Sequence, residues 1–571
     1  MPPPFAVENW KAEAAKARMK VEQSIPSAWR LPASLAALAV RGTLKPEDPR
    51  VISCGILEPR DIELTSISDV SILLQALSNR RCTAVEVATA FCKRAAIAHQ
   101  CTSCLTCFFP EEALKRAGEL DDYLATEGKV VGALHGLPVS LKDSFNMAGK
   151  VSSIGLVSWL PNIASENSEC SDAILAAGGV LFVKTGTSQA CLMVESINNI
   201  FGSIRNPYNP DLSVGGSSGG EGALLASKGS ILGLGTDGGG SLRFPAMFCG
   251  LWALKCSKGR VPAKGLASTY DGNESTNAGL GPLSRSVSGL EVGIRALLAT
   301  RPWERDPGCI PMAWKSQEAI RATGKLRIAV LRDDGVVEPV ASVVRAIQMV
   351  IKALERVGHE VVDLPAERMK TLHRRGTSCV MKSNVQNGGR SITKHIQASG
   401  EPVVPRTAVG SKDSLLTSEE IFANHVERSK ISREYSDVWL SYRMDAILSP
   451  AVAHPACPHG EYISNAYAGI YNMLDYVTGS IPVTTVRDDD APNQAWLERD
   501  PYPQIEAVRF PYDKGDKEMK DLYTSPAVFR DAPVGVQIVC QRLREEKCVG
   551  IMKEIEVLLA EPSIAHDNEH L

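Results

Sequence analysis

The chain has 571 residues, of which 44% are hydrophobic and 22% charged, the composition of a soluble globular protein. Its formal net charge of −3 argues against a nucleic-acid-binding protein, and no polybasic cluster is available to hold a membrane surface. The sequence contains no run of about 18 apolar residues, so no transmembrane helix is predicted. The N-terminus lacks the apolar core of a signal peptide, and we therefore expect a cytoplasmic protein.

The first part of the chain predicts helices followed by short strands. Residues 8–24 are polar and rich in Ala and Lys, which predicts a helix ending before Pro26, and proline and glycine predict irregular structure over 40–62. Thr83 has the residue type of an N-cap and starts a helix over 83–99. The other elements expected here are helices at 66–77 and 172–177 and strands at 137–141 and 179–184.

Strands and helices alternate over the rest of the chain. A strand at 326–332, a helix at 339–357 and a strand at 359–364 predict a βαβ unit. The alternation predicts an α/β fold, one large domain with a mixed, mainly parallel central sheet and helices on both faces. The other expected elements are helices at 220–228 and 545–559 and strands at 444–448, 481–486 and 534–539.

The order of these predicted elements also suggests how the chain is divided into domains. We expect residues 1–65 to form a helical and irregular extension packed on the core, and residues 66–561 to form the single large domain. Residues 562–571 are expected to be a flexible tail. The polar segment 487–530 predicts a long surface loop that could cover the functional site.

A glycine-rich window, GGSSGGEGALLASKGSILGLGTDGGGSLRFP at 215–245, carries the strongest functional signal. Glycine supplies eleven of the 26 residues at 215–240, where an average usage of ~7% would give about two. Glycine lets the backbone come close to another group. Ser217, Ser218 and Ser241 lie in these turns, and acyl transfer needs such a hydroxyl beside converging backbone N–H groups.

Two other motifs in this window are disfavoured by their context. Residues 215–219 fit G-x-S-x-G, but 206–214 predict a loop where the nucleophile elbow of an α/β hydrolase requires a strand. Residues 233–238 spell G-x-G-x-x-G, but Pro245 follows soon after, where a dinucleotide fingerprint should open a helix.

Metal motifs are also weak. Cys101, Cys104 and Cys107 form C-x-x-C-x-x-C, but no fourth cysteine with a proline follows, which favours ordinary packed thiols. Residues 566–570 spell H-x-x-E-H in a polar tail that offers no packed helix to hold a metal. The 15 cysteines are expected to be mostly buried thiols rather than disulfides. We predict no metal and no cofactor.

The base for a serine nucleophile must come from outside the window, which contains no histidine. Lys142 ends an apolar strand in HGLPVSLKDSF, flanked by Asp143 and by the hydroxyls of Ser140 and Ser144. An isolated Lys-Asp pair is more often a surface ion pair than a catalytic group. These residues alone leave both readings open.

The paired segments GGSSGGEGALLA and GLGTDGGGSLRFPA resemble the defining signature of the amidase signature hydrolases. GLPVSLKD is similar to the segment that carries the catalytic lysine of that family. Further similar stretches run from AFCKRAA at 90–96 to APVGVQIVCQRL at 532–543, and together they resemble the fungal general acetamidases.

The resemblance implies a Ser-Ser-Lys triad. Ser241 would be the nucleophile, Ser217 the proton relay on a cis peptide bond with Gly216, and Lys142 the base. A free lysine has a pKa of ~10.4, but burial lowers it, and the Ser217 hydroxyl can accept and donate at once. These residue types can therefore pass a proton from Ser241 to Lys142.

The resemblance also implies roles for residues around the triad. Relatives commonly carry a larger residue at the position of Gly238, so we expect a slightly wider pocket here. Cys191 would line the acyl pocket, Ser218, Asp237 and Arg243 would hold the two loops together, and Gly238, Gly239, Gly240 and Ser241 would supply the N–H groups of an oxyanion hole.

By this resemblance the protein is expected to be an amidase that hydrolyses a carboxylic amide to acid and ammonia or amine through an acyl-enzyme. Small aliphatic or aromatic primary amides are the first expectation. The alternatives are a pathway-specific amidase, esterase or lactamase acting on a larger amide, and the glutaminase subunit of an amidotransferase complex. A catalytically inactive scaffold is also considered, but the intact triad argues against it. The expected partner is a small-molecule amide, and a homodimer stays open.

Overall fold

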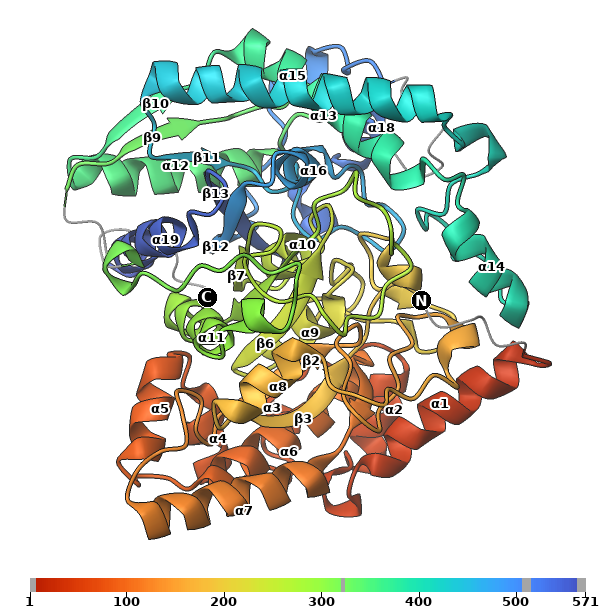
Figure 1. Ribbon diagram of the computed structural model, residues 1–571, viewed down its shortest axis with the longest axis vertical. Helices are drawn as coiled ribbons and strands as arrows, with labels where there is room; N and C mark the ends of the chain where they lie inside the picture. The colour runs from red at the N-terminus through yellow and green to blue at the C-terminus, as the bar shows by residue number, and fades with distance from the viewer. Residues whose placement is uncertain (1–6, 320–323, 506–514, 562–571) are drawn as a thin grey trace.

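An 11-stranded sheet runs through the molecule in the order β1-β3-β2-β6-β8-β7-β12-β13-β11-β9-β10 (Figure 1). The computed structural model describes residues 7–319, 324–505 and 515–561. The strands are β1 Leu105–Phe108, β2 Pro138–Lys142, β3 Val180–Thr185, β6 Leu232–Asp237, β7 Trp252–Lys255, β8 Gly279–Ser284, β9 Arg327–Val330, β10 Glu360–Asp363, β11 Ala446–Ser449, β12 Val477–Thr485 and β13 Pro533–Cys540.

The predicted mixed α/β sheet is present, with a smaller share of parallel pairs than the alternation suggested. Among the described strands, β2–β3, β2–β6, β9–β10 and β9–β11 are parallel. The other six neighbouring pairs are antiparallel. Strands β7 and β8 follow one another with no helix between them, and an antiparallel pair does not need a crossover helix.

Helices cover both faces of the sheet, as expected. A Cβ on Gly233 of β6 would meet Glu221 of α9 (Gly219–Ala226), whereas the neighbouring Leu232 lies against α11 (Val287–Ala299). Successive residues of a strand point to opposite faces. Helices α9 and α11 therefore lie on opposite sides of β6.

Most predicted helices are present, with ends displaced by a few residues. Thr83 caps α6 through a reciprocal pair of hydrogen bonds with Glu86, and α19 begins and ends at the predicted residues. Besides α9 and α11, the α-helices of the described residues are α1 Trp10–Ser24, α2 Ala33–Val40, α3 Pro49–Ile52, α4 Pro59–Ser66, α5 Val70–Ser78, α6 Ala84–Thr102, α7 Pro110–Glu127, α8 Glu169–Ala176, α10 Arg243–Phe248, α12 Ala341–Arg356, α13 Ala366–Val385, α14 Arg390–Ser399, α15 Ser418–Tyr442, α16 Ala466–Met473, α17 Gln494–Glu498, α18 Asp516–Leu522 and α19 Glu545–Leu559.

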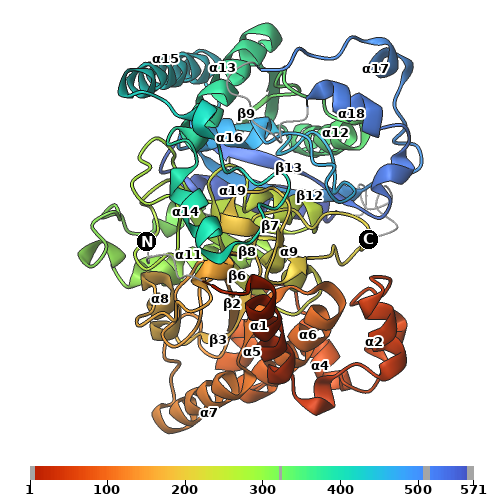
Figure 2. The same cartoon turned by 90° about the vertical axis from the view of Figure 1, so that its right-hand side faces the viewer.

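The N-terminal segment packs on the sheet domain through its own small apolar cluster. Leu31, Leu35 and Val51 are buried there against Ile97 and Cys101 of α6. Figure 2 shows α2 and α4 beside α6 in the lower half of the molecule. The division of the chain at residues 65 and 561 stays a prediction, and the expected tail lies outside the described residues.

The region expected to be one long loop, 487–530, contains α17 and α18, which lie near the top of the molecule in Figure 2. The βαβ unit of β9, α12 and β10 is present with its two strands parallel, as predicted. No helix in the described parts of the chain has the length and apolar character that crossing a bilayer requires.

Candidate active site

Lys142 is the last residue of β2, and its side chain is completely buried. Its Nζ lies 2.7 Å from Ser217 Oγ and 2.7 Å from Thr236 Oγ1. Burial penalises the ammonium form and so lowers the pKa of Lys142, against the charges of nearby acidic groups, which raise it. The environment therefore favours a neutral amine in contact with a serine hydroxyl.

Ser217 lies in a tight turn just before α9. The peptide bond between Gly216 and Ser217 is cis, as the resemblance implied. A Cβ on Gly216 would lie 2.7 Å from the carbonyl oxygen of Met193, so only glycine fits at that position. Ser196 supports the turn, because its Oγ donates to the Gly215 carbonyl at 2.9 Å and accepts from the Gly219 N–H at 3.0 Å.

Ser241 lies in the second tight turn, between β6 and α10, and lines the same cavity as Ser217. Its carbonyl oxygen accepts a hydrogen bond from the Ser218 N–H at 3.1 Å, and the Ser218 hydroxyl donates to the Thr236 carbonyl at 3.4 Å. These two contacts bring together the turns that carry the candidate relay and the candidate nucleophile.

The glycines before Ser241 lie in different surroundings. Gly238 and Gly239 line the cavity together with Ser241. Gly240, in contrast, donates its N–H to Asp237 Oδ1 at 2.7 Å. One of the four donors expected for the oxyanion hole is therefore already committed to a carboxylate, because the turn folds back on Asp237.

Asp237 and Arg243 form a completely buried ion pair across this turn, with Arg243 Nε 2.9 Å from Asp237 Oδ2. Burial would raise the pKa of Asp237, but the charge and hydrogen bonds of Arg243 hold it well below its usual range. The guanidinium group also donates to Asn472 Oδ1 of α16 at 2.5 Å and to Gln537 Oε1 of β13 at 3.1 Å. The pair thus fixes the nucleophile turn to the other half of the sheet.

A cavity of about 490 Å³ opens onto the two serines. Its walls come from distant stretches of chain that include the 190–195 turn, the 257–280 segment, the C-terminal part of helix α13 and the 462–465 segment just before α16. None of the described residues of 487–505 and 515–530 lines it, and residues 506–514 lie outside the described residues, so cover of the site by that segment stays a prediction. Its lining side chains include Cys191, Met193, Val380, Met381, Tyr462 and Asn465.

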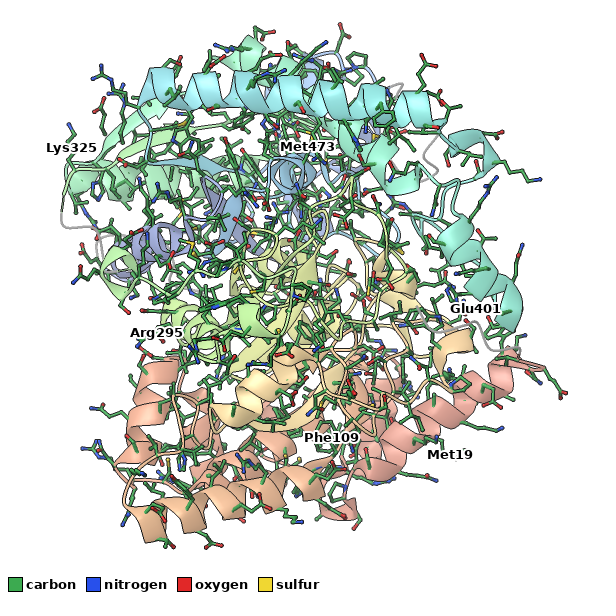
Figure 3. All side chains as sticks on the ribbon, in the orientation of Figure 1. Met19, Phe109, Arg295, Lys325, Glu401 and Met473 are labelled. Carbon is green, nitrogen blue, oxygen red and sulfur yellow. The ribbon has the colours of Figure 1, made fainter. Side chains whose placement is uncertain are left out.

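Cys191 lines the cavity, and its place in an acyl pocket stays a prediction. It ends the short turn Gln189–Cys191, and its Sγ lies 3.2 Å from Thr187 Oγ1. Glu401, labelled in Figure 3, anchors this turn from the end of α14 by accepting a hydrogen bond from Gln189 Nε2 at 3.0 Å. The buried carboxyl group therefore sets where the thiol enters the cavity.

Sequence reasoning missed Thr236 and Asn465. Thr236 precedes Asp237 in the glycine-rich window, where nothing relates it to Lys142. The pairing of β2 with β6 brings the two residues together. Asn465 Nδ2 would lie 3.2 Å from a Cβ on Gly239, although 226 residues separate them in the chain. No local pattern marks Asn465, and only the fold brings it to the site.

The cysteines of the C-x-x-C-x-x-C motif lie in different surroundings. Cys101 belongs to the N-terminal apolar cluster, Cys104 is buried in the main core and Cys107 is half-buried. Within residues 7–319, 324–505 and 515–561, no group of three or more His, Cys, Asp or Glu side chains could hold a metal ion. The 566–570 motif lies outside the described residues.

Comparisons with known proteins agree with this geometry. A family model described as amidase matches residues 86–549. An acetamidase from Aspergillus oryzae is 34% identical over 567 residues, covering 96% of this chain and 99% of the relative. An acetamidase from Emericella nidulans is 33% identical over 569 residues, covering 97% and 98%.

Solved structures show the same architecture. A fatty acid amide hydrolase superimposes with a TM-score of 0.88 at 29% identity, covering 97% of this chain and 96% of that one. A 6-aminohexanoate cyclic dimer hydrolase gives a TM-score of 0.67 at 20% identity, covering 88% and 98%, which is a likeness of fold alone.

Proposed function

The chain belongs to the amidase family, and on that premise we propose that it hydrolyses carboxylic amides to acid and ammonia or amine through a Ser-Ser-Lys triad. Ser241 is the nucleophile, Ser217 the relay and Lys142 the base. The observation that carries the proposal is the fully buried Lys142 Nζ, 2.7 Å from Ser217 Oγ, at a cavity that Ser241 also lines.

The first step activates the nucleophile. A buried neutral lysine takes the proton of Ser217 as Ser217 takes the proton of Ser241, and the Ser241 oxygen then attacks the amide carbonyl carbon. The negative charge that develops on the carbonyl oxygen is stabilised by the N–H groups of Gly238, Gly239 and Ser241. Thr236, which contacts the same amine, keeps Lys142 oriented toward the relay.

The second step breaks the carbon–nitrogen bond. The proton held by Lys142 returns through Ser217 to the leaving nitrogen, which departs as ammonia or amine and leaves an acyl group on Ser241. A water molecule then loses a proton along the same relay and attacks the acyl-enzyme. The products are the carboxylic acid and the regenerated triad.

The similarity to two acetamidases supports small aliphatic or aromatic primary amides as substrates. The cavity supports a second candidate, a larger amide, ester or lactam in a pathway-specific reaction. Its volume of about 490 Å³ is in the range that holds drug-sized ligands, far more than acetamide fills.

Ammonia release from the purified protein tests the proposal. The panel contains acetamide, benzamide, a long-chain amide and a lactam, the last followed by ring opening. Ser241→Ala should abolish turnover and leave the unfolding transition unchanged, because the small side chain at a cavity wall carries little packing. Ammonia release retained by Ser241→Ala would rule out the nucleophile assignment.

The same assay separates the remaining alternatives. Release of ammonia by the chain alone would exclude an obligate glutaminase subunit, which needs its complex. Turnover should be insensitive to EDTA, whereas inactivation by EDTA would favour a metal-dependent reaction at a site the triad does not use.

A further inference from the structure

Glu221 is a buried carboxyl group that the proposed triad does not use. It lies on the first turn of α9, four residues after Ser217, and is completely shielded from solvent. Its Oε2 accepts a hydrogen bond from Ser140 Oγ at 2.6 Å, and its Oε1 accepts one from Thr185 Oγ1 at 2.7 Å. Ser140 belongs to β2 and Thr185 to β3, so one carboxyl group joins a helix to two strands.

Both hydroxyl partners lie at the level of Lys142. Ser140 precedes Lys142 by two residues on β2, so their side chains point to the same face of the sheet. Thr185 is the residue of β3 that pairs with Lys142 in the parallel ladder. The carboxyl group of Glu221 is therefore hydrogen-bonded beside the strand end that carries the amine, from a helix that begins two residues after Ser217.

The backbone of strand β6 also packs against the carboxyl group of Glu221. A Cβ on Gly233 would lie 1.9 Å from Glu221 Oε2 and 2.8 Å from Ser140 Oγ. Only glycine lets β6 reach the carboxyl group, and β6 also carries Thr236, the second partner of Lys142. The first glycine of the G-x-G-x-x-G run thus has a packing reason unrelated to nucleotides.

The charge states of Glu221 and Lys142 are coupled. Burial raises the pKa of Glu221 to about 7, against the hydrogen bonds of Ser140 and Thr185 and the charge of Lys142, which lower it. Burial also lowers the pKa of Lys142. The Cys104 thiol also interacts with Glu221: burial raises the pKa of Cys104, and the charge of Glu221 raises it further.

We propose that Glu221 is a positioning residue for amide hydrolysis: its carboxyl group holds β2, and with it Lys142, at the distance from Ser217 that proton transfer requires. The inference rests on the proposed triad. Glu221 works through its hydrogen bonds rather than its charge, because a protonated carboxyl group and a neutral amine can both satisfy the contacts seen here.

Steady-state kinetics of three variants test this positioning role. Glu221→Ala should lower kcat by ~10- to 100-fold with KM unchanged, because misplacing a reacting group slows chemistry without touching the substrate. Glu221→Gln, which can donate and accept like the protonated acid, should keep kcat within about threefold and leave the acidic limb of the pH–kcat profile in place. Ser140→Ala, which removes one of the two bonds, should lower kcat by several-fold.

A matched control is Ser227→Ala at the other end of α9. Among the described residues the Ser227 hydroxyl donates to the Ala223 carbonyl of its own helix alone, so this variant should leave kcat unchanged. A wild-type kcat in Glu221→Ala overturns the inference, and so does Glu221→Gln falling as far as Glu221→Ala. If Glu221→Ala does not fold, an unchanged kcat in Ser140→Ala overturns it. Turnover by Ser241→Ala would instead refute the triad itself, which separates the two failures.

Discussion

At the scale of single residues, burial decides the chemistry of Lys142. A surface Lys-Asp pair and a catalytic lysine look alike in the sequence, where Lys142 is simply followed by Asp143. In the folded chain Asp143 instead accepts hydrogen bonds from Thr106, Ser153 and the Ile154 N–H, and Lys142 points to Ser217. The Asp143 carboxylate is therefore hydrogen-bonded to these groups, and the Lys142 amine contacts the hydroxyl of Ser217.

Replacing Lys142 by methionine should lower kcat by ~10²- to 10⁴-fold, the usual contribution of a general base. The working form is the neutral amine, so wild-type activity should rise with pH through the lowered pKa of Lys142. That limb of the pH–rate profile should vanish in Lys142→Met. A variant whose profile keeps the wild-type shape would show that another group is the base.

Two glycines of the nucleophile turn should respond differently to alanine. Gly240 has φ +116°, and a Cβ there would lie 2.1 Å from the Phe244 ring, so Gly240→Ala should lower the free energy of unfolding by about 1–3 kcal/mol or more. Gly238 has open space around it, and Gly238→Ala should stay within ~0.5 kcal/mol of wild type. Urea unfolding measures both, and equal midpoints would contradict the prediction.

At the scale of elements, the site depends on turns that segments distant in sequence hold in place. Glu195, completely buried beside the Gly216 turn, is in hydrogen-bond contact with His459 Nδ1 and accepts from the Gly460 N–H at 2.9 Å. Burial would lower the pKa of His459, but the hydrogen bond and charge of Glu195 raise it above its ordinary value. The contact between Glu195 and His459 therefore holds the 459–460 segment beside the Gly216 turn.

This pair should make stability depend on pH. A histidine with a raised folded-state pKa contributes stability that is complete below its unfolded pKa of ~6.5 and is lost as pH rises through the folded value. The difference in unfolding free energy between wild type and His459→Gln should therefore be largest below about pH 6.5 and shrink as the pH rises above that value. A difference that stays constant over this range would mean that the pair does not titrate there.

The accuracy of the element predictions followed the strength of the local signals. Thr83 correctly marked the start of α6, and both predicted ends of α19 match the structure. These predictions succeeded because the capping residue and the apolar period lie within the helix itself. Strands β6 and β8 were missed, since their glycines and prolines read as turns. Those glycines are needed because Glu221, Leu242 and the Ser218 hydroxyl pack directly on the β6 backbone.

At the scale of the whole molecule, the cavity sets the substrate. Its apolar walls at Met193, Val380, Met381 and Tyr462 come from separate parts of the chain and meet only in the folded protein. Within one series of linear primary amides, acyl groups longer than acetyl should therefore find additional buried contacts.

We expect kcat/KM to rise from acetamide to hexanamide. Each added methylene that is buried contributes ~0.8 kcal/mol, or about three- to fourfold in kcat/KM, until the cavity is filled. Initial rates of ammonia release over the series measure the trend. A steady decline from acetamide onward would favour a small-amide enzyme and leave most of the cavity unused.

The sequence by itself determined the family and the α/β class, and it predicted Ser217, Ser241 and Lys142 as the triad, because glycine turns and a hydroxyl nucleophile need fixed residue types at fixed spacing. Tertiary structure alone decided that Lys142 is buried against Ser217 and Thr236 and that the Gly240 N–H donates to Asp237. It also decided that Glu221 accepts a hydrogen bond from Ser140 on the strand of Lys142. It also decided the cavity walls. Burial and contacts between distant segments depend on how strands pair and helices pack, and no local pattern records them.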